Sequence, residues 1–266
     1  MELTGRCQLE CQHCYASSGP SGTHGTMREP DWRRVIDQAE QLGARMVQFI
    51  GGEPTLHPAL PALIGHALNH DVAVEVFSNL VHVPATLWDV LAQPGVRLAT
   101  SYYSDDPRQH RAITQRPTHG RTTENIREAL RRSIPLRVGV IDVHDGQRSE
   151  QAVNELRALG VTNVGTDRLR ELGRGGGQSA AQLCGRCGDG AVAVSPDGSV
   201  WPCVMSRWMA VGNVHEKSLQ EIVAALPGVV GVLREQGMPA SVGVQQCGPD
   251  CAPSGGQCYP INCYPR

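Results

Sequence analysis

The sequence predicts an α/β fold built on a parallel sheet, followed by a small cysteine-rich extension at the carboxyl end. The first observation is that short β-rich runs alternate with stretches of helical periodicity along residues 1–174. Repeated strand–helix units build parallel sheets with right-handed crossovers. The second observation is that the ten cysteines fall in only two regions, residues 7–14 and 184–263. This clustering indicates cofactor ligands rather than scattered core thiols.

The expected elements follow in chain order. A short first strand ends at Gly5, and a helix is expected from Pro30 to about Leu42, because Pro30 suits a first helical turn and apolar residues then recur at helical spacing. Further strands are expected at residues 45–50, 72–77, 96–100, 136–141 and 161–165, and helices at 59–70, 84–93, 122–133 and 149–159. Arg174-Gly-Gly-Gly177 is a break in composition, so the chain is divided into segments 1–174 and 175–266.

The composition excludes several classes of protein. With 266 residues, of which 40% are hydrophobic and 19% charged, the chain reads as soluble and globular. No run of eighteen apolar residues is present, so no membrane association is expected. The net charge of -2 gives no electrostatic basis for binding nucleic acid. Clustered cysteines without an apolar signal segment predict a cytoplasmic protein rather than a secreted disulfide framework.

The first cysteine group, Cys7-Gln-Leu-Glu-Cys11-Gln-His-Cys14, holds three thiols in one short loop. Three such thiols can bind the same iron–sulfur cluster, whereas a [4Fe-4S] cube needs four ligands. One iron is therefore expected to stay open, and an open position on a metal marks a reactive site rather than a structural one. A zinc site made by Cys11 and Cys14 with Cys184 and Cys187 is the alternative, but it leaves Cys7 unexplained.

The cysteine spacing of three and then two residues resembles that of the radical S-adenosylmethionine (SAM) superfamily. Gly51-Gly-Glu-Pro54, about forty residues later, resembles the GGEP motif of the same family. The resemblance covers nearly the whole chain and implies a partial (β/α)6 barrel. It also implies a [4Fe-4S] cluster on Cys7, Cys11 and Cys14 whose open iron binds SAM, and reductive cleavage of SAM to methionine and a 5'-deoxyadenosyl radical.

The resemblance also implies which residues bind SAM at the carboxyl ends of the strands. Glycines allow a close backbone approach, and Glu53 can accept hydrogen bonds from the SAM ammonium group. The implied contacts are His13 and Ile141 against adenine, Gly51, Gly52, Glu53 and Pro54 at the amino group, Ser78, Asn79 and Ser101 toward the ribose, and Arg168 and Arg170 toward the methionyl carboxylate. His110, in a polar stretch, is expected to be solvated.

The second cysteine region resembles the SPASM or twitch extension, which holds auxiliary [4Fe-4S] clusters. A hairpin turn at Pro196-Asp-Gly198 and a helix at residues 218–226 are expected within it. The implied ligands are Cys184, Cys187, Cys203, Cys247, Cys251, Cys258 and Cys263. Seven thiols cannot fully ligate two cubes, so one or two auxiliary clusters are expected, with a structural zinc site as the alternative. At least one of the four terminal cysteines is predicted not to be a cluster ligand and, if the enzyme is an epimerase, to act as the hydrogen donor; the alternative is that all four bind iron or that one is a buried thiol.

The predicted function is that of a radical SAM enzyme which takes hydrogen from a substrate carbon. Maturation of a ribosomal peptide by a crosslink or an oxidation is the first hypothesis. The second is a radical epimerase or dehydrogenase of a small molecule such as an aminoglycoside sugar, and the third is a non-enzymatic iron–sulfur or zinc protein. The expected partners are a peptide or small-molecule substrate, an electron donor such as flavodoxin or ferredoxin, and a separate leader-peptide-binding protein.

Overall fold

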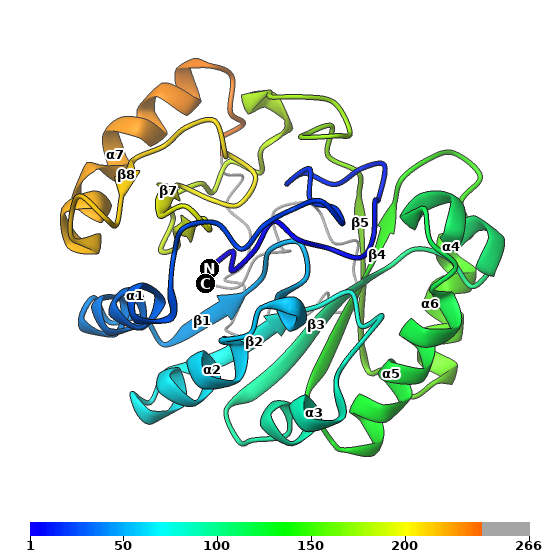
Figure 1. Ribbon diagram of the computed structural model, residues 1–266. Helices are drawn as coiled ribbons and strands as arrows, with labels where there is room; N and C mark the ends of the chain where they lie inside the picture. Colours follow the sequence, from blue (N-terminus) through cyan, green and yellow to red (C-terminus); the bar gives the residue numbers. More distant parts are fainter. Residues whose placement is uncertain (241–266) are drawn as a thin grey trace.

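A computed structural model describes residues 1–240 and contains a five-stranded parallel sheet with helices on its outer side (Figure 1). The strands are β1 (Met46–Phe49), β2 (Ala73–Phe77), β3 (Val96–Tyr102), β4 (Leu136–Asp142) and β5 (Asn163–Arg168). Neighbours in the sheet are also neighbours in sequence, and every pairing is parallel. The predicted α/β fold is therefore confirmed, and the open, curved sheet is that of a partial barrel.

The helices alternate with these strands. They are α1 (Glu29–Gln41), α2 (Leu60–Asn69), α3 (Ala85–Leu91), α4 (Pro107–Thr114), α5 (His119–Arg131), α6 (Ser149–Ala158) and α7 (Leu219–Glu235), with short 3-10 turns at Pro54–Leu56 and Ala180–Gln182. The sequence did not predict α4, because few of its residues are apolar. Its start is nevertheless well defined, since the Asp106 carboxylate accepts hydrogen bonds from the backbone N–H groups of Arg108 and Gln109.

The amino-terminal segment differs from the strand expected there. Glu2 and Ile50 form an isolated parallel bridge, and the Leu3 N–H donates to the Ile50 carbonyl at 2.8 Å. The Met1 amino group also donates to the Gln48 carbonyl of β1 at 2.7 Å, so the segment pairs only with the end of β1 and with Ile50 instead of adding a full strand to the sheet. The described part of the chain therefore has five barrel strands and not six.

The two faces of the sheet have different character. The outer face packs apolar side chains such as Phe49 and Val76 against the helices, where Trp32 of α1 is fully buried. The inner face holds Glu75, which accepts hydrogen bonds from Arg97 at 2.9 Å and from Arg137 at 2.7 Å. Glu75 is fully buried, and these guanidinium groups hold its pKa below the ordinary value despite the opposing effect of burial.

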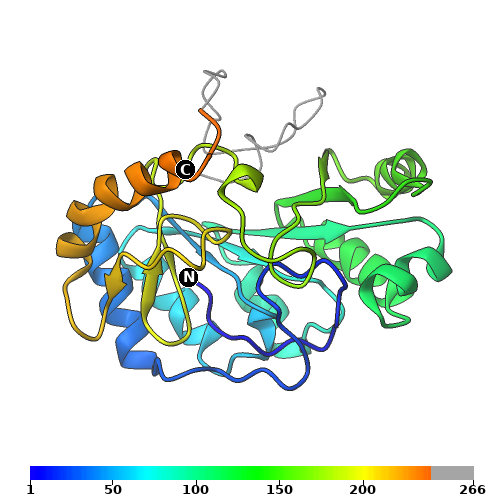
Figure 2. The same cartoon turned by 90° about the horizontal axis from the view of Figure 1, so that it is seen from above.

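The segment after the barrel forms a three-stranded antiparallel sheet of β6 (Ala193–Val194), β7 (Ser199–Trp201) and β8 (Gly212–Asn213). The predicted hairpin is confirmed, with Gly198 at a φ of 86°. Helix α7 lies beside α1 (Figure 2), and the Leu219 N–H donates to the Gln38 side chain at 2.6 Å. Val194 and Val200 belong to the same hydrophobic core as the barrel. The division at residue 174 stays a prediction.

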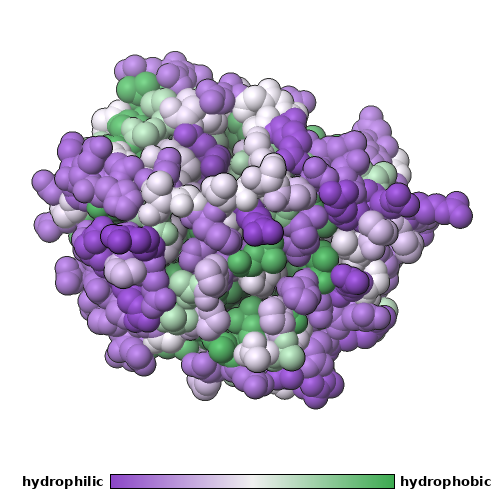
Figure 3. Space-filling view, in the orientation of Figure 1, coloured by the Kyte–Doolittle hydropathy of each residue, from purple (hydrophilic) through white to green (hydrophobic). Residues whose placement is uncertain are grey.

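The surface is polar over most of its area. On the face seen in Figure 3, hydrophilic residues cover the margins and hydrophobic residues are most visible near the middle. Within residues 1–240, no helix has the length and apolar character needed to cross a bilayer.

Candidate active site

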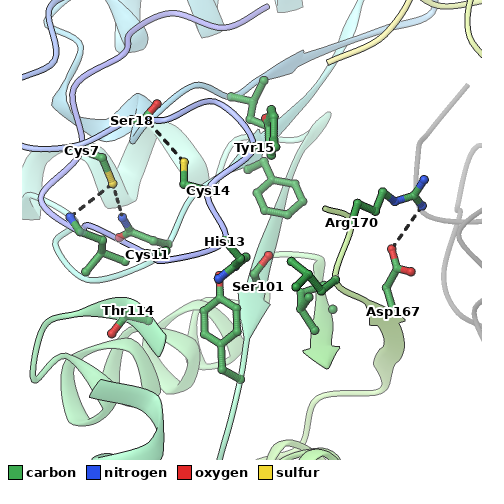
Figure 4. Close-up of a pocket in the computed structure, with 18 of the residues that line it drawn as sticks. Cys7, Cys11, His13, Cys14, Tyr15, Ser18, Ser101, Thr114, Asp167 and Arg170 are labelled. Atoms are coloured by element: carbon green, nitrogen blue, oxygen red, sulfur yellow. Dashed lines mark hydrogen bonds and ion pairs between the residues drawn. The ribbon is translucent and has the colours of Figure 1, made fainter. Parts of the chain in front are cut away.

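A cavity of about 230 Å³ lies at the carboxyl ends of the barrel strands. Its lining includes Cys7, Cys11 and Cys14 from the amino-terminal loop (Figure 4). Every strand of the barrel also contributes at or just after its end, through Ile50, Asn79, Ser101, Ile141 and Arg168. The expectation that the cysteine loop and the strand ends face one site is confirmed.

Backbone and side-chain N–H groups point at two of the three sulfur atoms. Leu9 N–H lies 3.4 Å and Asn79 Nδ2 3.5 Å from Cys7 Sγ, and Ser18 N–H lies 3.3 Å from Cys14 Sγ. Such donors favour the thiolate, which is the form that binds a metal. Burial raises the pKa values of Cys7 and Cys11 to about 12, so in this pocket the thiolates need the charge of a bound metal. This donor set fits a cluster held by three cysteines.

The loop is held from two sides by backbone hydrogen bonds. On one side it donates hydrogen bonds to the last turn of α4. The Glu10 N–H donates to the Thr114 carbonyl at 3.3 Å, and the Gln12 N–H donates to the Ile113 carbonyl at 3.2 Å. On the other side, the Cys7 N–H donates to the Gly19 carbonyl at 3.0 Å. The spacing of the three sulfurs is thus set by the barrel and not by the loop alone.

The two glycines after β1 let this loop lie against the strand end. A Cβ atom on Gly52 would lie 2.3 Å from the Arg6 carbonyl oxygen, and one on Gly51 would lie 2.5 Å from that of Thr4. Gly51 also has a φ of 145°, which L side chains rarely adopt. Both glycines line the cavity, as predicted, and both are needed for the approach of residues 4–6.

Glu53 lies behind the cavity wall, fully buried. Its Oε1 accepts from Thr55 N–H at 3.1 Å, from Thr55 Oγ1 at 2.8 Å and from Ser78 Oγ at 2.8 Å, and its Oε2 accepts from Asn79 N–H at 2.8 Å. Burial raises the pKa of Glu53, and these hydrogen bonds oppose that effect. Glu53, Pro54 and Ser78 do not line the cavity, so the contacts with SAM expected of them stay predictions.

The remaining predicted SAM residues line the cavity. They are His13, Asn79, Ser101, Ile141, Arg168 and Arg170. Of the two arginines, Arg170 is buried and lies 3.6 Å from the Asp167 carboxylate (Figure 4). Arg168 is exposed. His13 Nε2 lies 3.1 Å from the Tyr103 hydroxyl, and burial lowers the pKa of His13 to about 4. His13 is therefore neutral in this pocket at neutral pH.

Two residues of the cavity, Tyr103 and His110, are not among those that the sequence predicts. The expectation that His110 is solvated is wrong, because it is 2% exposed on the buried side of α4 and lines the cavity. Tyr103 could have been found from the sequence, since residues two apart in a strand point to the same side and Ser101 was already a candidate. The sequence gives little signal for His110, because Ile113 is the one apolar residue on the helix face that the two share with Thr114.

The second cysteine group lies in a separate cavity of about 900 Å³. Cys184, Cys187 and Cys203 line it, and the Sγ atoms of Cys187 and Cys203 are 3.2 Å apart. The hydrogen bond from Cys187 lowers the pKa of Cys203 to about 7 and raises that of Cys187. Cys187 and Cys203 converge and Cys184 lines the same cavity, so these thiols can form part of a metal or cluster site. Cys247, Cys251, Cys258 and Cys263, with the predicted hydrogen donor among them, lie outside the described residues.

Comparison with protein families gives two matches. Residues 1–165 match the model described as the radical SAM superfamily, and residues 184–228 match the SPASM model, described as an iron–sulfur cluster-binding domain. A PqqA peptide cyclase of Streptomyces rochei is 29% identical over 167 residues, which are 62% of this chain and 46% of that protein. A PqqA peptide cyclase of Xanthomonas campestris pv. campestris is 36% identical over 81 residues, which are 30% of this chain and 20% of that protein. The chain thus spans less than half of the length of these two relatives.

Several solved structures share the fold. SuiB of Streptococcus suis bound to S-adenosylmethionine has a TM-score of 0.73 at 16% identity, over 88% of this chain and 66% of SuiB. The anSMEcpe structure with bound AdoMet and a peptide has a TM-score of 0.66 at 12% identity, over 87% of this chain and 81% of anSMEcpe. BtrN in complex with AdoMet and 2-DOIA has a TM-score of 0.52 at 16% identity, over 88% of this chain and 85% of BtrN. At these identities the similarity concerns the fold.

Proposed function

Because the chain belongs to the radical SAM superfamily, we propose that it takes a hydrogen atom from a residue of a ribosomal peptide and leaves a crosslink or an oxidised residue. The observation that carries the proposal is the shared cavity, in which Cys7, Cys11 and Cys14 meet the ends of all five strands. A bound [4Fe-4S] cluster and SAM would supply the chemistry, a one-electron cleavage of SAM to methionine and a 5'-deoxyadenosyl radical.

The residues of this chain would hold, orient and shield the reactants. Asn79 and Ser101 place polar groups at the strand ends, where they can accept or donate hydrogen bonds to a ribose. Phe77, Val138 and Ile141 give the same cavity an apolar wall. An apolar wall excludes water, which protects a radical from side reactions, and fixed side chains keep the reacting atoms in line.

A peptide substrate is supported by the relatives named PqqA peptide cyclase and by the fold shared with SuiB bound to its precursor peptide SuiA. Forming a crosslink removes one hydrogen atom, one proton and one electron from the substrate, so an electron acceptor is required. The cavity around Cys187 and Cys203 is the proposed place for that acceptor. A flavodoxin or ferredoxin would supply the electron that cleaves SAM, and a separate protein would present the leader peptide.

The first test is SAM cleavage by the anaerobically reconstituted protein with dithionite. The wild type is expected to form 5'-deoxyadenosine, measured by liquid chromatography and mass spectrometry. The Cys7→Ala, Cys11→Ala, Cys14→Ala triple variant should form none, and retained activity in that variant would exclude this site as the source of the chemistry.

The second test identifies the substrate class, using short peptides encoded near the gene. A crosslink is expected to lower the peptide mass by a pair of hydrogen atoms and to block fragmentation between the joined residues. An unchanged mass in H2O, with one solvent deuterium gained on a carbon in D2O, would instead indicate epimerisation. Turnover of an amino sugar with no turnover of any peptide would reject the peptide proposal.

A further inference from the structure

Arg174 lies against the loop that carries the first cysteine group. Its Nη1 donates to the Cys11 carbonyl at 2.7 Å, its Nη2 donates to the Ser18 carbonyl at 2.5 Å, and its backbone N–H donates to the Cys14 carbonyl at 3.0 Å. One residue therefore binds the backbone of two cysteines and the far end of the loop. The sequence by itself indicates only a boundary between two segments at this position.

The glycines around Arg174 make this contact possible. Gly173 has a φ of 58°, and a Cβ atom there would lie 2.1 Å from the Tyr15 carbonyl oxygen. Gly173 and Gly177 exchange backbone hydrogen bonds at 2.9 Å, which closes a tight turn, and Gly175 lies against the backbone of His13. The glycine run is thus a turn packed on the cysteine loop, and it fixes the position from which the Arg174 side chain extends.

Within residues 1–240 the Arg174 guanidinium donates to carbonyl oxygens and forms no ion pair with a carboxylate. A guanidinium presents a planar fork of donors that can span two acceptors, which an ammonium group cannot do in the same way. Arg174 therefore combines a geometric constraint on the loop with a fixed charge beside the thiols.

We propose that Arg174 is a positioning residue for the cluster-binding cysteines, which fixes the backbone of Cys11 and Cys14 and raises the reduction potential of the cluster they hold. Reduction adds a negative charge to the cluster, and a nearby cation stabilises the reduced form. Groups that orient metal ligands commonly change metal affinity by about 10- to 100-fold when they are removed. The inference rests on a cluster at Cys7, Cys11 and Cys14 and on no assumption about the substrate.

The test compares Arg174→Gln and Arg174→Lys with the wild type as reconstituted holoproteins. Two properties are measured by electron paramagnetic resonance on the cluster signal that changes when SAM is added: its rate of loss to a chelator and its midpoint potential. Arg174→Gln is expected to lose that cluster about 10- to 100-fold faster and to show a more negative potential. Arg174→Lys should keep a potential near that of the wild type but still lose the cluster faster, since lysine cannot span both carbonyls.

Arg116→Gln is the matched control, because Arg116 contacts the same loop only through the exposed side chain of Glu10. It should behave as the wild type in both measurements. A wild-type rate and potential in Arg174→Gln would overturn the proposal. If that variant fails to fold by circular dichroism, Arg174→Lys decides, and a wild-type rate of cluster loss in it would overturn the proposal. Failure of the proposed peptide chemistry would leave these measurements unaffected.

Discussion

The Glu53 side chain connects the glycine pair after β1 to the end of β2. Its two oxygens accept hydrogen bonds from Thr55, Ser78 and Asn79, so it orders three segments of the cavity wall at once. Asn79 in turn donates to Cys7 Sγ at 3.5 Å. Glu53 does not line the cavity, but through Asn79 it influences the geometry of the cysteine site.

Replacing this carboxylate by an amide should destabilise the protein. In Glu53→Gln, the amide NH2 must face either Asn79 N–H or Thr55 N–H, so one partly buried donor loses its acceptor. The expected loss in the free energy of unfolding is about 1–3 kcal/mol, measured by urea denaturation. Glu40→Gln, at an exposed position of α1, is the control and should change stability little. Equal stability of the two variants would contradict the role assigned to Glu53.

His57 gives the fold a pH dependence. Burial lowers its pKa to about 4, and its Nδ1 accepts a hydrogen bond from the Ala59 N–H at 3.3 Å, which requires the neutral form. The unfolded chain, with an ordinary pKa near 6.5, binds the proton more readily than the folded one. The stability that neutral His57 contributes is therefore complete above about pH 6.5 and is lost as the pH falls toward 4.

The size of this effect can be measured with His57→Asn, whose side-chain oxygen can replace Nδ1 as an acceptor. Between pH 7 and pH 5 the wild type should lose up to about 2 kcal/mol through this group, and the variant should lose correspondingly less. Urea unfolding at the two pH values gives the comparison, with His82→Asn at an exposed position as control. If the wild type, His57→Asn and His82→Asn all lose the same free energy of unfolding between pH 7 and pH 5, His57 makes no such contribution.

At the scale of elements, the glycine pair after β1 makes a close backbone contact with the amino-terminal segment. In Gly52→Ala the new methyl group would lie 2.3 Å from the Arg6 carbonyl oxygen, and the atoms of Arg6 and Gly5 that it would meet are all backbone. The segment before Cys7 must therefore move, at a cost of about 1–3 kcal/mol. The thermal unfolding temperature should fall, and the yield of the SAM-responsive cluster should fall with it.

Gly65→Ala is the matched control for that prediction. Gly65 lies inside α2, and no atom outside its own helix backbone and chain neighbours lies within 4 Å of the place that an alanine methyl group would take. Alanine should therefore stabilise the helix by roughly 0.5–1 kcal/mol. We therefore expect Gly52→Ala to lower the stability of the protein and Gly65→Ala to raise it. A neutral Gly52→Ala variant would mean that the loop has another way to reach the strand end.

The elements that could be predicted from sequence are those with a local signal. The five barrel strands and the helices α1, α2, α3, α5 and α6 follow from periodicity, and the cysteine loop follows from spacing. Helix α4 could not be found in this way, because His110 and Thr114 are polar and are buried only by the tertiary fold. Arg174 is more than 150 residues from the loop that it binds, and no local pattern connects the two.

At the scale of the whole molecule, the amino-terminal segment joins the two cysteine regions. The Glu2 N–H donates to the Val194 carbonyl at 2.7 Å, and the Glu2 carboxylate binds Arg207, which stacks 4.4 Å over the Trp201 ring. This segment leads directly into Cys7. The two cavities hold different cysteines but share Ile50, Arg170 and Met205 in their linings, so the two cysteine regions are held in a fixed relation.

Because the two groups of cysteines line different cavities, we expect the two regions to fill with iron independently. After anaerobic reconstitution the chain should hold more than about four iron atoms, since one cube accounts for four. Removing Cys7, Cys11 and Cys14 should abolish 5'-deoxyadenosine formation but remove only part of the iron, because Cys187 and Cys203 line the other cavity. Cys187→Ala with Cys203→Ala should have the complementary effect and leave the SAM-responsive signal in place. Complete loss of iron in either variant, measured by colorimetric iron assay on folded protein, would show that the two regions build a single site.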